Sequence, residues 1–258
     1  MERRKIRLTP LTRLTFSFNA ELNLDANGVF NSHTTYENYI ERYLEVDRKQ
    51  NQLIRSLYTT NAILFLILSG QDWTIPFFQV TISSIPAIQE ILLFSAAMGF
   101  FFLCAIFVTG QCYVGLINQC GNRIVDNNRV DPDFFNASRK HFDFFLKLYS
   151  PKLNIWGVDF YEHGRGFAVF SYMIKAIMLV VVLVFPAVHI LLTVLTSIQV
   201  YQSELNPYGI WFLLGSVALI NFGGLAMVFG MNKEFDFVAI EPPANIDNNS
   251  ETKEISSD

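Results

Sequence analysis

Charged residues are scarce in this sequence. Only 16% of the 258 residues are Asp, Glu, Lys or Arg, whereas 51% are hydrophobic and Phe alone accounts for 25 residues. A water-soluble domain of this composition would expose large contiguous apolar patches, which soluble proteins avoid. The composition therefore excludes an ordinary soluble domain and indicates a membrane protein.

Cysteine is also rare, and its positions exclude a disulfide framework. Cys104, Cys112 and Cys120 all lie in or just beyond one apolar run, and the connecting segments contain no cysteine. Disulfide frameworks need paired cysteines in segments that face one another. We therefore interpret the three thiols as small apolar packing residues.

The sequence lacks the motifs of the common enzyme classes. It contains no Walker loop, GxGxxG, HExxH, CxxC or GxSxG pattern. The His and Asp residues between positions 118 and 166 do not have metal-ligand spacing, and the basic residues are dispersed rather than gathered in a patch. A cleavable signal peptide is not expected, since mostly polar residues follow the basic start. The sequence predicts no enzyme, no cofactor or metal site and no nucleic-acid partner.

Four long apolar stretches are present, over residues 53–70, 88–117, 167–198 and 208–231. A helix rises about 1.5 Å per residue, so roughly 20 apolar residues cross a hydrocarbon layer about 30 Å thick. The last three stretches meet this length easily, whereas the strongly apolar part of the first, residues 62–68, is short. The predicted fold class is an all-α membrane protein, a four-transmembrane-helix bundle with cytoplasmic helical extensions and a small N-terminal β element.

The distribution of Lys and Arg predicts the orientation of this bundle. Residues 1–55 hold nine basic residues and residues 118–166 hold seven, whereas residues 71–86 and 199–207 hold none. Cytoplasmic loops retain an excess of positive charge. We therefore expect a multi-pass protein of the plasma or inner membrane, in contact with the lipid bilayer, with both termini and the 118–166 connection in the cytoplasm.

The N-terminal segment, residues 1–52, is predicted to be a β-strand followed by an amphipathic helix. Hydrophobic side chains occupy every even position from Leu14 to Leu24, and period two is typical of a half-buried strand. Such a strand needs a partner, which would be residues 5–11, another copy of the chain or a different protein; the alternative is an extended arm on the membrane surface. From residue 34 to residue 69 no Gly or Pro interrupts a continuous helical pattern.

The membrane domain, residues 53–231, is followed by an acidic tail over residues 232–258. This tail has two basic and seven acidic residues and a composition typical of disorder. Inside the membrane domain, the cytoplasmic connection 118–166 contains an aromatic-rich amphipathic segment that begins at Pro132. We interpret it as an interfacial or docking helix, or as an ordinary helix packed on the second and third spans.

Polar residues within the spans are the best candidates for function, because their burial in hydrocarbon is costly. Asn61, His189 and Asn221 each lie about ten residues from the outer end of their helix, near the middle of the membrane. They are predicted to form one cluster. Its role is either a proton- or ion-sensitive constriction, since imidazole titrates near neutral pH, or a set of interhelical hydrogen bonds that fix the bundle.

Two further features of the spans are candidates. Lys175, the basic residue within the third span, is predicted to lie level with Gln111. It either snorkels to the cytoplasmic headgroups or attracts anions in a cytoplasmic vestibule. Pro186 removes a backbone hydrogen bond and is predicted to kink the third span.

Small residues recur every seven positions in the fourth span, at Gly209, Ser216, Gly223 and Gly230. Such a stripe lets another helix approach closely and predicts tight packing or oligomerisation. The first functional hypothesis is therefore a homo-oligomeric pore, channel-like or membrane-perturbing effector. The alternative is a non-conducting structural or scaffold subunit that meets protein partners through its cytoplasmic face.

Overall fold

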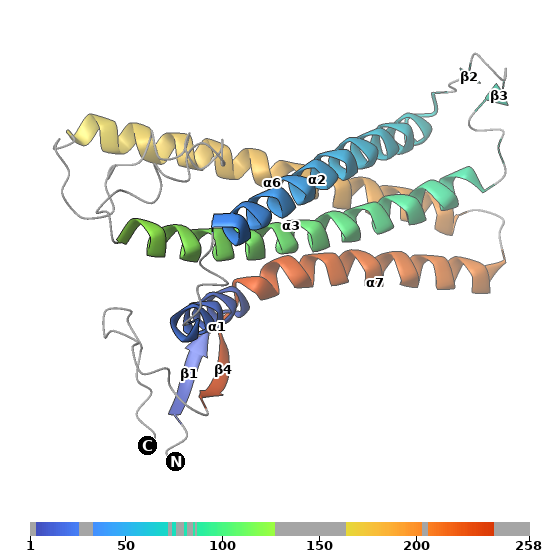
Figure 1. Cartoon of the computed structure of the whole chain (residues 1–258). Coiled ribbons are helices and arrows are strands. Elements are labelled where there is room, and N and C mark those ends of the chain that lie inside the picture. The colour runs from blue at the N-terminus through green and yellow to red at the C-terminus, as the bar shows by residue number, and fades with distance from the viewer. Residues whose placement is uncertain are drawn as a thin grey trace, which may run out of the picture.

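The computed structural model describes residues 4–25, 33–71, 74–75, 80–81, 85, 87–126, 164–202 and 206–239. These residues are mostly helical, with two small antiparallel sheets. Helices α2 (His33–Leu68), α3 (Ile88–Asp126), α6 (Arg165–Tyr201) and α7 (Pro207–Met231) run lengthwise beside one another (Figure 1). Helix α1 (Pro10–Leu24) crosses one end of this bundle, and the short strands β2 (Thr74–Ile75) and β3 (Val80–Thr81) lie at the other end.

Helix α3 is the centre of the bundle, since it contacts α1, α2, α6 and α7. The main core joins Leu57 and Leu64 of α2 to Ala96, Phe100 and Leu103 of α3, all of them buried. A second core at the α1 end joins α1, α2 and α3 through the buried side chains of Leu22, Tyr36, Ile40, Ile117 and Cys120. The uninterrupted helix predicted over residues 34–69 is confirmed by α2.

The strand predicted over residues 14–24 is wrong, because these residues form helix α1. Thr9 caps the helix, since its Oγ1 accepts a hydrogen bond from the Thr12 amide at 3.0 Å, and Pro10 occupies the first helical turn. The even-numbered apolar positions include Leu14, Phe18 and Leu22, which are four apart and share one helical face. The apolar alternation over residues 14–24 therefore fits both the period of a strand and the period of a helix. The helix cap at Thr9 and Pro10 favours the helix.

The β element near the N-terminus is instead a strand pair that joins the two ends of the chain. Strand β1 (Arg4–Leu8) pairs antiparallel with β4 (Phe235–Ala239), and Leu8 lies opposite Phe235. The Arg13 guanidinium lies 4.8 Å from the centre of the Phe237 ring and connects this sheet to α1. The disorder predicted for the tail 232–258 is therefore wrong for residues 235–239, and residues 240–258 lie outside the described part.

Within the described residues, three helices are long and apolar enough to cross a membrane: α3, α6 and α7. These helices suggest a multi-pass membrane protein. Helix α2 does not qualify, because the strongly apolar part of its second half is limited to residues 62–68 and its first half is polar and charged. There Glu45 pairs with Lys49 at 2.8 Å and with Arg42 at 3.0 Å, and these hydrogen bonds lower the pKa of Glu45.

The amphipathic segment predicted within 118–166 falls largely in residues 127–163, outside the described residues.

Candidate functional site

A hydrogen-bonded triad occupies the middle of the bundle. His189 of α6 lies between two asparagine carboxamides: its Nδ1 is 3.2 Å from Oδ1 of Asn61 on α2, and its Nε2 is 3.0 Å from Oδ1 of Asn221 on α7. The side chain of His189 is completely buried, and both asparagines are 6% exposed. The structure thus brings together the three polar residues that were expected to lie at one depth. We call Asn61, His189 and Asn221 the polar triad.

The fourth helix of the bundle contributes an aromatic ring to this site. Phe100 of α3 stacks on the His189 imidazole, with ring centres 4.5 Å apart and planes inclined by 24°. The same Phe100 belongs to the main core with Leu57 and Leu64 of α2. All four long helices therefore meet at His189. Sequence reasoning missed Phe100, because the run Phe100-Phe101-Phe102 does not show which ring faces inward.

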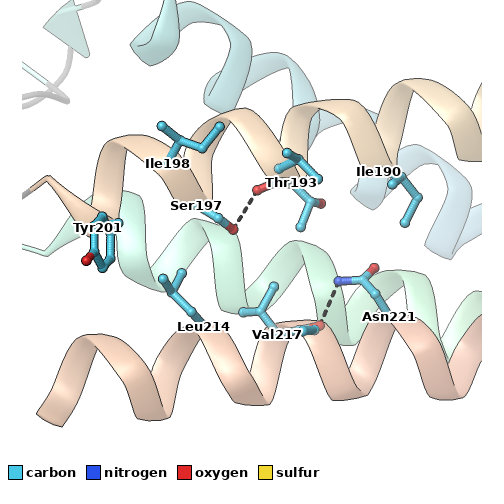
Figure 2. A pocket seen from close by; sticks show the side chains of 10 residues that line it. Ile190, Thr193, Ser197, Ile198, Tyr201, Leu214, Val217 and Asn221 are labelled. Atoms are coloured by element: carbon cyan, nitrogen blue, oxygen red, sulfur yellow. Dashed lines mark hydrogen bonds between the residues drawn. The ribbon is translucent and has the colours of Figure 1, made fainter.

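The hydrogen bonds of Asn221 fix its orientation. Its Nδ2 donates to the carbonyl oxygen of Val217 at 2.9 Å (Figure 2), so its Oδ1 faces His189 and accepts a hydrogen bond from the Nε2–H group. The Asn61 carboxamide has no such second hydrogen bond among the described residues. When the Asn61 oxygen faces Nδ1 of His189, both imidazole nitrogens donate hydrogen bonds and the ring is cationic. When the Asn61 NH2 group faces Nδ1 instead, Nδ1 accepts and the ring is the neutral Nε2–H tautomer.

The triad can therefore accept either protonation state of His189 by turning a single carboxamide. Neither state requires a helix to move, because the Asn61 oxygen and nitrogen occupy nearly the same volume. Chemically, the site can hold a proton and tie three helices together. It contains no nucleophile and no carboxylate.

The other sequence candidates lie apart from the triad. Lys175 is exposed on α6, whereas Gln111 is partly buried on α3, and within the described part of the chain no hydrogen bond or ion pair joins them. Pro186 lies inside α6, which continues as one helix from Arg165 to Tyr201. The kink at Pro186 stays a prediction.

The small residues of α7 do not act as one stripe within the chain. A Cβ on Gly223 would lie 3.4 Å from the Phe101 ring, but a Cβ on Gly209 or Gly230 would meet nothing within 4 Å. Ser216 is partly buried. Among the described glycines of α7, Gly224 lies in the tightest contact with α3: a Cβ there would lie 3.3 Å from Cys104 Sγ and 3.4 Å from the Phe101 Cα.

Gly224 was not singled out from the sequence, although the adjacent pair Gly223-Gly224 is a signal that could have identified it. Two neighbouring glycines remove two adjacent side chains from one helical turn, which permits a close helix crossing. A Cβ on Gly209 or Gly230 would point into open space. They are available to lipid or to another chain.

The described residues contain no group of three or more His, Cys, Asp or Glu side chains that could hold a metal ion. Searches against protein-family models, curated proteins and solved structures found no match.

Proposed function

We propose that this protein is a non-enzymatic, four-span membrane protein of the cell membrane, with α2 as the fourth span. Strand β1 precedes α2 and strand β4 follows α7, yet the two strands pair with each other. Strands on opposite sides of a bilayer cannot pair. Three crossings by α3, α6 and α7 would separate them, so the pairing supports a fourth crossing between β1 and β4.

Helix α2 is suited to this fourth crossing. Its 36 residues correspond to a length of about 54 Å, and its second half packs along α3 through Leu57 and Leu64. Asn61, in that half, bonds to His189 at the centre of the other three helices. The excess of Lys and Arg in residues 1–55 and 118–166 supports a cytoplasmic location for both termini.

We infer that the protein acts as a homo-oligomer with an anion-attracting vestibule between copies. The observation that carries this function is Lys175, an exposed ammonium among apolar neighbours on α6, without a hydrogen bond or ion pair to the described residues. Ionisable residues in membrane helices usually face water-filled cavities, and rings of Lys favour anions. The centre of a single chain is closed by the polar triad and Phe100, so a pathway would run between chains rather than through one.

The open surfaces of α6 and α7 support assembly. Apolar side chains of α6 from Phe167 to Val184 are widely exposed, and Gly209 and Gly230 leave open space beside the two ends of α7. A second copy can approach such a surface closely. A monomer whose α6 and α7 surfaces contact only lipid would also be stable. The mass of the purified particle therefore distinguishes a monomer from a homo-oligomer.

The experiment combines mass and flux. The protein purified in mild detergent is expected to give the mass of a symmetric homo-oligomer, and proteoliposomes containing it are expected to release halide. Lys175→Gln should reduce halide flux about tenfold or more while the particle mass is unchanged, whereas Arg165→Gln, at the start of the same helix, should have little effect. A homo-oligomer without halide flux, or a halide flux that Lys175→Gln leaves unchanged, would contradict the proposed anion vestibule.

The second candidate is a non-conducting structural or scaffold subunit. It is favoured by the closed centre of the bundle and by the platform that α1, β1 and β4 form at one end (Figure 1). A monomer, or a complex with a different protein bound at this platform, would support it. The same mass measurement therefore separates the two functions.

A further inference from the structure

The sheet formed by β1 and β4 carries an uneven distribution of charge. Three of the five residues of β1 are cationic, namely Arg4, Lys5 and Arg7, whereas β4 contributes one carboxylate, Asp236. Asp236 lies 2.9 Å from Arg7, and both side chains are more than half exposed. Lys5 is exposed and makes no ion pair with another described residue. The sheet therefore has a net positive charge.

Lys5 and Arg7 lie on the open face of this sheet. Side chains alternate between the two faces of a strand, and Ile6 and Leu8 on the opposite face are half-buried. On that opposite face, the Phe237 ring contacts α1. Among the described strands, β1 has β4 as its one neighbour, so its second edge offers unpaired N–H and C=O groups. Figure 1 shows the sheet projecting from beneath α1, away from the four long helices.

Residues 240–258 of the acidic tail continue from this sheet and carry the opposite charge. They contain five acidic residues and one basic residue, Lys253. Ala239, the last residue of β4, lies opposite Arg4, so residue 240 follows about 5 Å from β1. A five-residue strand is about 17 Å long, and a chain extends by up to about 3.3 Å per residue. Asp247 can therefore reach any position along β1.

We propose that the acidic residues of segment 240–258 bind the cations of β1 in the same chain and cover the free edge of the sheet. Runs of like charge commonly serve as interaction segments. A segment tethered at this distance has an effective concentration in the millimolar range, so a contact with a dissociation constant of about 1 mM would be about half occupied. A covered edge cannot accept a strand from a different protein. The segment thus competes with partners of the platform formed by α1, β1 and β4.

Zero-length crosslinking of the full chain tests this contact. The protein is placed in nanodiscs of phosphatidylcholine, which has no net charge, and a carbodiimide joins Lys amines to carboxylates in direct contact. At low salt, Lys5 is expected to link to residues 247–258 with a yield at least about fivefold above that of Lys233. Lys233 is the control, because it is also exposed and lies closer to the segment along the chain. In about 0.5 M salt the Debye length is about 4 Å, so the ratio of the two yields should fall to about one.

Variants of the segment separate attraction from proximity. Asp247→Lys combined with Glu251→Lys brings the net charge of residues 240–258 to zero and leaves Glu254 available as a reporter, so the ratio of yields should fall to about one. Asn245→Gln combined with Asn248→Gln keeps the charge and should leave the ratio unchanged. All four substitutions follow β4, so neither variant alters a residue of the described bundle.

Two outcomes would overturn the proposal. A yield at Lys5 no higher than that at Lys233, at low salt in the unmodified protein, would leave the cations of β1 for anionic lipid headgroups. A mixture of unlabelled and 15N-labelled protein identifies the chain that supplies the segment: links within one chain support the proposal, whereas links between chains contradict it.

None of these outcomes depends on the oligomer or the flux. The pairing of β1 with β4 places both ends of the described chain on one side of the membrane, and the links are measured without ion transport. A protein that shows the links but conducts nothing would contradict the anion vestibule and leave this contact intact.

Discussion

Replacement of His189 by alanine is expected to lower the free energy of unfolding by about 3 kcal/mol. The change removes two hydrogen bonds, worth roughly 0.6 kcal/mol each inside a membrane, and leaves a cavity beneath Phe100 at the point where four helices meet. It also leaves the Oδ1 atoms of Asn61 and Asn221 without the imidazole. The measurement is the unfolding midpoint of the purified protein on titration with a denaturing detergent.

The matched control is Leu191→Ala on the same helix. Leu191 is 57% exposed, so its truncation should cost less than about 0.5 kcal/mol. A double replacement of His189 and Asn221 should be less destabilising than the sum of the single changes by roughly 0.6 to 1.7 kcal/mol, because both single changes break the same bond. Equal effects of His189→Ala and Leu191→Ala would show that the triad does not hold the bundle together.

Replacement of Gly224 by leucine is the second change with a large expected effect. A Cβ at this position would lie 3.4 Å from the Phe101 Cα, a backbone atom that cannot rotate away, and 3.3 Å from Cys104 Sγ. The longer leucine side chain would push α7 away from α3, with a cost of about 3 kcal/mol or a failure to fold. Loss of a monodisperse peak in gel filtration, or a lowered unfolding midpoint, is the expected readout.

Gly215→Leu provides the control for this prediction. A Cβ at Gly215 would meet nothing within 4 Å, so the same substitution nine residues away on α7 should be tolerated. Similar stability of the two leucine variants would contradict the close α3–α7 approach. The comparison also controls for helix propensity, since both changes improve it to the same extent.

The sequence was sufficient to predict the polar triad because membrane helices restrict where polar side chains lie. In the structure Asn61 lies seven residues before the end of α2, His189 twelve before the end of α6 and Asn221 fourteen after the start of α7, so the three lie at comparable heights in the bundle. Depth does not determine rotation about the helix axis, however. The facing direction of Phe100 and Gly224 therefore became known only from the packing.

The N-terminal region shows why other features could not be predicted. The spacing of Leu14, Phe18 and Leu22 fits both a strand and a helix, and Thr9 and Pro10 were the local signals that favoured the helix. The pairing of β1 with β4 joins residues more than two hundred positions apart, and no local pattern encodes such a contact.

The central claim is that four helices cross the membrane and leave both termini in the cytoplasm. It is tested by epitope tags at the two termini and by a Gln71→Cys substitution in a background with Cys104, Cys112 and Cys120 changed to alanine. In intact cells, a membrane-impermeant maleimide is expected to label position 71, which lies just after α2, and both tags should be protected from external protease until the membrane is opened. Tags on opposite sides of the membrane, or position 71 on the same side as both tags, would contradict the four-span bundle.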